Sequence, residues 1–550
     1  MTPHMTRRTF VRASAATVVA LGLPSCGGSP SRPPGTVRIA GGFFGFPSPF
    51  AYIAGIGYNQ MSLMYDTLLW KDGSGRLLPW LARDVRRSAD ALTYTFELRP
   101  NVRWHDGRRL TAADVAFTFQ YFARQPLGPL LVSKPVGVRE ARATGPLTVE
   151  IELKAPAVTF LDAVAGALPI IPRHIWSSID DAPQAQTRDV LVGTGAYRMK
   201  SLSVGEGSSL YLANDEHFLG RPFVRRVELR PVDDELTAVR AGEIDVGETP
   251  VEGVRREALD PFRSDTGFGI VRETGSWTFP LIFNLARGGA LGDVRFRRAC
   301  AHAIDRREIV QRLLGGDGQP GNPGFLPPGH PFHAQVEQYP FDRAAAGRLL
   351  DEAGFLRGEG GVRRGRDGKP LRLHVLTGGQ PLPPALDLLV EGLRGVGIEL
   401  VAQAVDLPTL FARTEAESDE LAMTLYPGPG GTAPSGDPDT LRTFFSSRVR
   451  GRIQGAQGWS DAEFDHLADR QLATTDVAAR RRMIARMQEI VARDVPALAL
   501  YYSTVSHPFD RRIFDRWYVT PGGYAGGLPG VLNKHVLITG NRTGLRIRAR

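Results

Sequence analysis

Strand-like and helix-like hydrophobic patterns follow one another along most of the chain. Residues 37–40 (VRIA) and 93–98 (TYTFEL) place apolar side chains in the pattern of strands, and the second alternates apolar and polar positions strictly. Residues 371–402 read as strand, helix and strand, which is a βαβ unit. The pattern therefore predicts a mixed α/β protein.

Helix start signals precede most of the apolar segments with helical spacing. A helix is predicted after Asp293, with Val294, Cys300, Ala301, Ile304 and Leu314 among its apolar positions. Other helices are expected after Thr111 with Asp114, after Asp342, after Ser460 with Glu463 as a capping box, and over about residues 476–493.

Length and composition exclude several classes of protein. The 550 residues correspond to roughly three to four domain-sized units. With 42% hydrophobic and 23% charged residues, large cores are expected and global disorder is not. Two cysteines exclude a disulfide-dense scaffold and a four-cysteine zinc site. The absence of an apolar run of about 18 residues excludes a polytopic membrane protein.

The net charge of +9 does not indicate nucleic-acid binding. Only six of the 67 basic residues are lysine, and the arginines are spread through the chain. No helix-turn-helix or zinc-finger spacing concentrates them. We therefore expect no nucleic-acid partner, and the basic end of the chain (NRTGLRIRAR) is interpreted as a solvated tail.

The N-terminal segment has the features of an export signal. Arg7 and Arg8 resemble a twin-arginine motif, and the apolar stretch that follows, residues 13–23, is too short to span a bilayer permanently. The sequence LPSC ending at Cys26 resembles a lipoprotein cleavage box. We therefore predict a signal peptide over 1–25, acylation of Cys26 and a flexible tether over 26–35. The alternative is an ordinary signal with an incidental cysteine.

Motifs for catalysis and cofactor binding are weak. HExxH, GxSxG and P-loop patterns do not occur. Gly316, Gly318 and Gly321 match GxGxxG but follow a helix rather than a strand, so a loop is the better interpretation. His330 and His333 lie in a proline-rich loop without nearby metal-ligand partners. We expect no enzyme activity, cofactor or metal, although residues of a catalytic triad can be far apart in sequence.

A dense series of motifs carries a family resemblance. Residues 64–85 (MYDTLLWKDGSGRLLPWLARDV) and the following SADALTYTFELRPNVRWHDGRRLTAADVAFTFQYF resemble the signature of the family 5 extracytoplasmic solute-binding proteins. These are the dipeptide, oligopeptide and nickel receptors of ABC importers. Further matching segments cover roughly residues 36 to 505 in order: 192–199, 214–230, 238–247, 283–310, 463–476 and 495–502.

The resemblance implies a fold and a division into domains. It implies an α/β, two-lobed periplasmic-binding-protein-like fold (type II, cluster C) with an extra subdomain in the first lobe. The chain would cross between the lobes near 275–280 and 495–505. The implied boundaries are 36–62, 188–275 and 500–550 for the first lobe, 63–187 for its extra subdomain, and 276–499 for the second lobe.

The resemblance also implies a function without covalent chemistry. A peptide or similar small solute would be enclosed as the lobes close and then delivered to an ABC permease in the membrane. The protein would be monomeric and periplasmic or on the cell surface. The alternatives are a receptor for a non-peptide solute (an oligosaccharide, an opine or a metal chelate) and, less favoured, a secreted hydrolase.

The same resemblance suggests ligand contacts. An Asp-Pro pair in peptide-binding members meets the peptide's amino terminus, and Asp437-Pro438-Asp439 stands in the matching region here. A carboxylate pairing with a buried ammonium is physically reasonable, but a turn facing solvent would look the same. Trp277 and Phe279 at the predicted crossing either line the cleft or pack the hinge. The remaining candidates are the aromatic residues Tyr426, Phe43, Phe44 and Phe46.

Overall fold

The computed structural model describes most of the chain after residue 31. Residues 35–550 form one compact unit, and of the residues before it only 32–34 are described. The described residues are 32–71, 76–125, 137–247, 256–378, 385–405, 409–410, 412–413, 423–425, 428–429, 437–449, 458–515, 517 and 534–540.

A four-stranded sheet forms the base of what we call the first lobe. Its order is β1-β10-β9-β8, and the outer strand β1 is parallel to β10 while the other pairs are antiparallel. The strands are β1 (Thr36–Ala40), β8 (Tyr197–Ser203), β9 (Ser208–Ala213) and β10 (Arg226–Arg230). The helices nearby in sequence are α1 (Ala54–Ser62), α4 (Glu235–Ala241) and α5 (Asp260–Ser264). The predicted strand over 37–40 is confirmed as β1.

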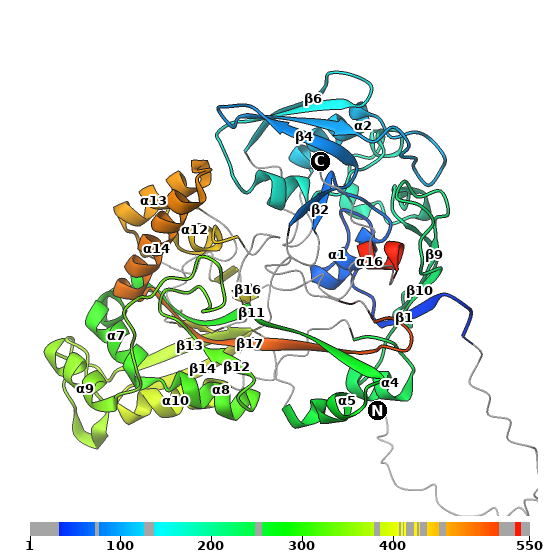
Figure 1. Ribbon diagram of the computed structural model, residues 1–550. Coiled ribbons are helices and arrows are strands. Elements are labelled where there is room, and N and C mark those ends of the chain that lie inside the picture. The colour runs from blue at the N-terminus through cyan, green and yellow to red at the C-terminus, as the bar shows by residue number, and fades with distance from the viewer. Residues whose placement is uncertain are drawn as a thin grey trace, which may run out of the picture. The chain divides into compact units, whose positions relative to one another are not determined.

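A second four-stranded sheet, of order β4-β5-β7-β6, lies next to α2 in the upper part of Figure 1. The alternation predicted for residues 93–98 is confirmed in β5, whose side chains are buried at every second position. The helix start predicted at Thr111 with Asp114 is also confirmed, because Asp114 accepts from the backbone N–H of Thr111 at the start of α2. The elements are β2 (Leu69–Lys71), β3 (Leu77–Pro79), β4 (Ala82–Arg87), β5 (Thr93–Leu98), α2 (Ala112–Arg124), β6 (Val138–Ala143), β7 (Thr148–Leu153), the π-helix η1 (Phe160–Ala165) and α3 (Arg173–Trp176).

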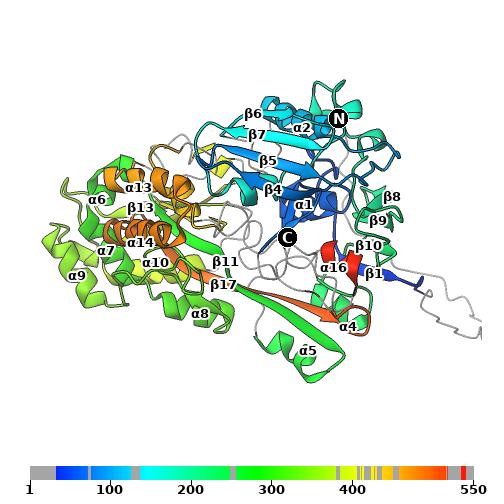
Figure 2. The same ribbon diagram turned by 45° about the horizontal axis from the view of Figure 1, so that its top comes forward.

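The second lobe is built on a larger sheet of order β12-β17-β11-β15-β13-β14, with β16 paired to β11. The predicted βαβ unit is confirmed, since β13 and β14 are parallel and α10 lies between them in sequence. Figure 2 shows α7 to α10 gathered beside this sheet. The strands are β11 (Phe268–Phe283), β12 (Gly318–Pro320), β13 (Arg372–Gly378), β14 (Glu399–Val405), β15 (Met423–Leu425), β16 (Gly428–Pro429) and β17 (Ala497–Asp510). The helices are α6 (Gly289–Gly292), α7 (Val294–Ala303), α8 (Arg306–Leu314), α9 (Arg343–Glu352) and α10 (Ala385–Gly395).

Two predictions about helices in this lobe were wrong in detail. The single helix expected after Asp293 is two helices, because the chain turns at Ile304 and Asp305 caps a new helix by accepting from the N–H groups of Arg307 and Glu308. The residue that caps α13 is Asp461 rather than Ser460, since its carboxylate accepts from the Phe464 N–H.

Two further helices follow the predictions. The helix expected over about 476–493 is α14 (Val477–Asp494), and the helix after Asp342 is α9, for which Asp342 is the N-cap. The others are α12 (Thr440–Phe445), α13 (Ala462–Ala473) and the C-terminal α16 (Lys534–Thr539).

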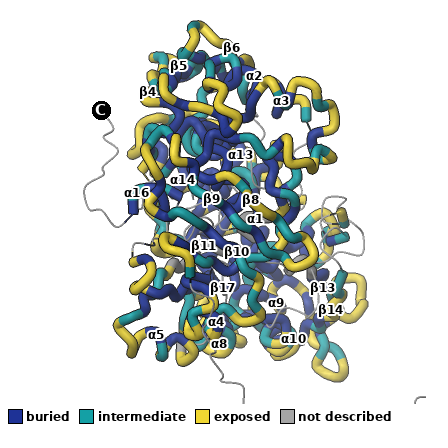
Figure 3. Tube along the Cα trace, turned by 90° about the vertical axis from the view of Figure 1, so that its right-hand side faces the viewer, coloured by how far each residue is buried: buried dark blue, intermediate teal, exposed yellow. Residues whose placement is uncertain are grey.

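Two long antiparallel strands connect the sheets of the two lobes. β11 and β17 pair from Phe268 with Asp510 to Ile282 with Ala497, with register shifts between Thr274 and Thr278 and again at Phe279. Figures 1 and 2 show them running side by side from α5 into the sheet of the second lobe. Residues along β17 are buried throughout, which Figure 3 shows among the inner segments. A bulged pair of strands is a suitable place for a hinge.

The hydrophobic cores divide between the lobes. The largest cluster joins the sheet of the first lobe to the β4-β5-β7-β6 subdomain and to residues 536–538 of α16, and a smaller one lies under α4 and α5. The two other clusters belong to the second lobe and share β11 and β17. The mixed α/β class is confirmed, and the domain boundaries stay a prediction.

Candidate functional site

The predicted Asp437-Pro438-Asp439 turn begins α12 and is fixed by arginine side chains. Asp439 is 5% exposed and accepts two hydrogen bonds from Arg442, both of 2.7 Å. Burial raises the pKa of Asp439, and Arg442 opposes this rise. Asp437 accepts from both terminal nitrogens of Arg480, one at 2.8 Å, and from the Asp439 N–H at 2.8 Å. Both carboxylates therefore already have cationic partners.

A buried glutamine ties the two acid–arginine pairs into one network. Gln471 on α13 is fully buried, and its Nε2 donates to Asp439 Oδ1 at 2.5 Å. Its Oε1 accepts from Arg480 Nε at 2.9 Å. The Arg480 guanidinium also lies 5.5 Å from the Phe332 ring centre, within cation–π range. The turn is thus held rigidly by α13 and α14.

Charged groups of the first lobe face this network. Lys71 Nζ at the end of β2 lies 3.3 Å from Asp162 Oδ1 on η1. Burial lowers the pKa of Lys71, and Asp162 and Asp437 act against that shift. Burial raises the pKa of Asp162, with Lys71 and Arg480 acting against it and Asp437 adding to it. Asp437 thus acts electrostatically on both residues of the first lobe, and Arg480 acts on Asp162.

A backbone hydrogen bond joins the lobes at the same place. The Val158 N–H, just before η1, donates to the carbonyl oxygen of Leu472 at 2.8 Å. Leu472 is in the last turn of α13, where helix carbonyls lack intrahelical partners. The contact between the lobes is therefore direct, and it satisfies a helix end.

The predicted aromatic candidates lie in different surroundings. Phe279 stacks on Tyr501 with ring centres 4.4 Å apart and packs against a core cluster of the second lobe. Phe43 is 39% exposed, whereas Phe44 and Phe46 are partly buried against the core of the first lobe. The side chain of Trp277 and all of Tyr426 lie outside the described residues, as do Arg7, Arg8 and Cys26. A ligand-binding role for these residues stays a prediction.

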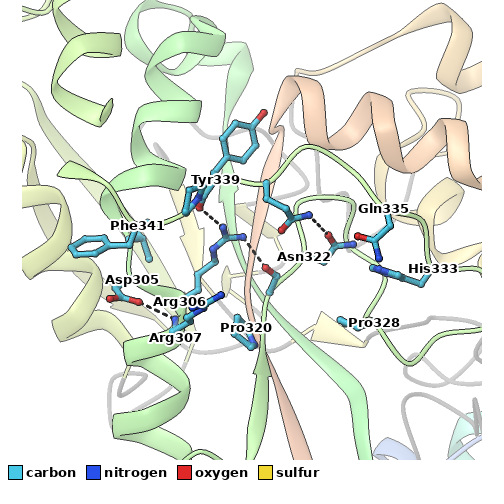
Figure 4. Close-up of a pocket in the computed structure, with 14 residues that line it drawn as sticks. Asp305, Arg306, Arg307, Pro320, Asn322, Pro328, His333, Gln335, Tyr339 and Phe341 are labelled. Atoms are coloured by element: carbon cyan, nitrogen blue, oxygen red, sulfur yellow. Dashed lines mark hydrogen bonds between the residues drawn. The ribbon is translucent and has the colours of Figure 1, made fainter. Parts of the chain in front are cut away.

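A cavity of about 630 Å³ lies within the second lobe, beside the start of α8 (Figure 4). The Arg306 guanidinium donates to the carbonyl oxygens of Gly321 at 2.7 Å and Tyr339 at 2.5 Å. Asn322, also on the wall, accepts from Gln338 Nε2 and donates to Leu326 O. The buried polar groups of this cavity thus bond to one another, so they do not identify a ligand.

The GxGxxG match is a structural feature of this same loop. Gly318 begins β12, which pairs with β17, so the motif lacks the strand-to-helix turn of a dinucleotide site. A Cβ at Gly321 would lie 1.9 Å from the carbonyl oxygen of Ala499, so only glycine allows this close approach to β17. The motif thus does not have the structure of a dinucleotide turn, but the interpretation as a loop was wrong for Gly318–Pro320, which form a strand.

A buried ion pair in the first lobe had no sequence prediction. Lys534 on α16 is 0% exposed and donates to Asp66 Oδ1 at 2.8 Å, to Tyr65 O at 3.0 Å and to Ser62 O at 3.2 Å. The ammonium also lies 4.2 Å from the ring centre of Trp70. Burial tends to raise the pKa of Asp66, but the lysine and His217 outweigh it and hold that pKa well below its usual range. This pair attaches α16 to the first lobe.

The described residues contain neither a membrane-spanning helix nor a cluster of metal ligands. Every helix there is too short or too polar to cross a membrane. The same residues include no group of three or more His, Cys, Asp or Glu side chains placed to hold a metal ion.

Comparisons with known proteins give relatives over most of the chain. Protein XP55 of Streptomyces lividans is 32% identical over 370 residues, which is 65% of this chain and 65% of that protein, just under two thirds of its length. The oligopeptide-binding protein AppA of Bacillus subtilis is 24% identical over 516 residues, covering 89% of this chain and 92% of AppA.

Solved structures share the fold. AppA of Bacillus subtilis, in complex with a nonapeptide, has a TM-score of 0.73 at 20% identity over 90% of this chain and 98% of that one. NikA of Brucella suis, in complex with Fe(III)-EDTA, has a TM-score of 0.72 at 23% identity over 86% of this chain and 95% of that one. The two-lobed α/β periplasmic-binding-protein fold expected from the sequence is confirmed.

The family profile described as "Bacterial extracellular solute-binding proteins, family 5 Middle" matches residues 76–451. This range begins at the subdomain of the first lobe, includes β11 and the βαβ unit, and extends past the Asp437 turn. The chain belongs to the family 5 bacterial extracellular solute-binding proteins.

Proposed function

We propose that this protein captures a peptide or similar small solute between its two lobes and delivers it to an ABC permease without altering it. The observation that supports this most is the family match over residues 76–451, and AppA, an oligopeptide-binding protein, matches most of the chain. Other solutes are open, since NikA of the same fold holds Fe(III)-EDTA. A non-peptide solute is therefore the second candidate.

The strands β11 and β17 are the proposed hinge of this mechanism. A hinge works where a few residues absorb the backbone change while the lobes move as units. The register shifts between Thr274 and Thr278 lie next to the crossing between the lobes that the sequence predicts near 275–280. Closure about this point would exclude water from a bound solute and present a defined surface to the permease.

The experiment that tests the function separates binding from turnover. Mass spectrometry of the purified protein identifies any co-purifying solute, and a peptide library followed by thermal shift identifies binders. A receptor gives saturable binding with a stabilisation that grows as RT ln(1 + [L]/Kd), and it leaves the solute intact. Consumption of the solute would instead support a secreted hydrolase.

We further propose that the ligand carries a protonated amine that meets Asp437 or Asp439. Asp437 is the better candidate, because Asp439 is more deeply buried and bonds to both Arg442 and Gln471. If closure desolvates an ammonium–carboxylate pair, Asp437→Asn costs about 3–5 kcal/mol of binding free energy. That equals roughly a hundredfold to a thousandfold or more in affinity.

Calorimetric titration of Asp437→Asn and Asp439→Asn measures this effect once a ligand is known. A carboxylate that merely faces solvent would change the binding free energy by less than about 1 kcal/mol. If both variants bind within about fivefold of wild type, the amine is bound elsewhere or absent, and an uncharged sugar or a metal chelate becomes the better candidate.

The proposed location is outside the cytoplasm, in keeping with the family. Export by the twin-arginine route and anchoring through acylated Cys26 are proposed from the sequence of residues 7–26. Removal of the signal would take away Arg7, Arg8 and Arg12 and lower the net charge from +9 to +6. A monomer is the expected state.

A further inference from the structure

Two ion pairs lie on the two sides of a direct contact between the lobes, where the Val158 N–H donates to Leu472 O at 2.8 Å. The first lobe contributes Lys71 with Asp162, whose charged atoms are 3.3 Å apart. The second lobe contributes Asp437 with Arg480, joined by two hydrogen bonds. Exposure of these side chains is 14% and 28% in the first pair and 12% and 9% in the second, so all four are largely shielded from solvent.

Lys71 is the charge through which the two pairs attract each other. Asp437 stabilises the charged form of Lys71, whereas on Asp162 the repulsion by Asp437 is larger than the attraction by Arg480. The four charges sum to zero, and separation of the lobes would expose both pairs to more water. If Lys71 is removed, the carboxylates of Asp162 and Asp437 repel each other with only Arg480 to compensate.

The second lobe holds its half of the contact rigidly. Gln471 bonds to both Arg480 and Asp439, so the Asp437 carboxylate cannot turn away without breaking a buried network. The hydrogen bond from Val158 to Leu472 aligns η1 with the end of α13. Charged side chains that are already held in place lose little conformational entropy when the two lobes come into contact.

We propose that Lys71 and Asp162 with Asp437 and Arg480 form a charged latch that stabilises the closed arrangement of the two lobes. The latch rests on the proposed receptor function, because it sets how readily the cleft opens to take up or release a solute. It acts at the contact between the lobes and needs no bound ligand.

Distances between spin labels on the two lobes test the latch in the ligand-free protein. Labels are placed by Ala89→Cys in the first lobe and Arg470→Cys on α13, both exposed positions, in a Cys26→Ser background; Cys300 is 0% exposed and stays unlabelled. The variants are Lys71→Met, the charge-conserving Lys71→Arg, and Arg142→Met. Arg142 pairs with Glu150 at 3.1 Å within the subdomain and serves as the matched control.

The wild type is expected to show a population at the distance of the closed structure. Lys71→Met should lower that population at least about threefold, as the loss of one partly buried ion pair predicts, whereas Lys71→Arg and Arg142→Met should retain it. In an Asp437→Asn background, Lys71→Met should have an effect below about 1.5-fold, because the two residues act on each other.

Equal closed populations in wild type and Lys71→Met would overturn the latch, and so would a wild type without a closed population. These results would leave the receptor function standing if the protein still binds solutes saturably. Absence of saturable binding to the peptide library and of any co-purifying solute would count against the receptor function, whatever the label distances show.

Discussion

The buried Lys534–Asp66 pair offers a sharp test of how the C-terminal helix is held. In Lys534→Met, a side chain of similar length replaces the ammonium, and Asp66 at 0% exposure loses its lysine partner and keeps His217 at 3.7 Å. Breaking a buried pair in this way costs about 3–5 kcal/mol of the free energy of unfolding. The low end of that range is expected, because Asp66 keeps hydrogen bonds from Trp80 Nε1 at 2.7 Å and Thr194 Oγ1 at 2.8 Å.

The effect should depend on pH with a definite sign. In wild type the pKa of Asp66 is lowered, so its contribution to stability is present above the unfolded pKa of about 3.9 and is lost only as pH falls through the folded pKa. Without Lys534, burial is opposed by His217 and by neutral hydrogen-bond donors, and we expect the folded pKa of Asp66 to rise past the unfolded value. The variant would then lose stability as pH rises, by at most about 1.4 kcal/mol per pH unit, until the folded pKa is passed.

Urea unfolding followed by tryptophan fluorescence measures this difference, because Trp70 and Trp80 lie 4.2 Å and 5.4 Å from the ammonium. The loss of stability in Lys534→Met should be larger at pH 8 than at pH 5. Adding Asp66→Asn should recover part of it, since no buried charge remains. The matched control is Lys369→Met, whose side chain is 83% exposed and which should cost less than about 1 kcal/mol. A loss below about 1 kcal/mol at pH 8, or one that is the same at both pH values, would refute the reasoning.

Two further predictions concern the N-terminal segment and the buried thiol. Arg7→Lys with Arg8→Lys should leave precursor in the cytoplasm, and Cys26→Ser should release the protein from the membrane fraction; normal export of the first variant, or a wild type that is already soluble, would contradict them. Burial raises the pKa of the Cys300 thiol, so native protein should react with a thiol reagent at position 300 only after unfolding, and labelling of that cysteine in the folded state would contradict its burial.

Local elements were predictable from the sequence because their causes are local. The alternation in 93–98 has a period of two, and the βαβ unit is bounded by its own turn and capping residues. The missed break between α7 and α8 also had a local signal, since Asp305 is followed three residues later by Glu308. Apolar residues recur at helical spacing across Ile304, and the prediction gave this spacing more weight than the capping signal at Asp305.

The partners at the site were not predictable in the same way. Asp437 could be selected from an Asp-Pro pair, but its arginine is 43 residues further along the chain on another helix. The groups that face it, Lys71 and Asp162, belong to the other lobe. Lys534 and Asp66 are 468 residues apart. The sequence does not indicate which residue a charged side chain pairs with when only the tertiary fold brings the two together.

The ligand proposal and the latch proposal make opposite predictions for the same substitution. If a ligand ammonium binds Asp437, it competes there with Lys71. Lys71→Met should then increase the affinity for the ligand, because it removes a cation that already interacts with the Asp437 carboxylate. If Lys71 instead joins the lobes, the same variant favours the open form and should weaken binding in proportion to the lost closed population. Asp437 already has Arg480 as a partner, so a second cation from the other lobe and a third from a ligand cannot all be accommodated at full strength. The sign of the affinity change in Lys71→Met therefore decides which cation Asp437 is placed to meet when the cleft closes.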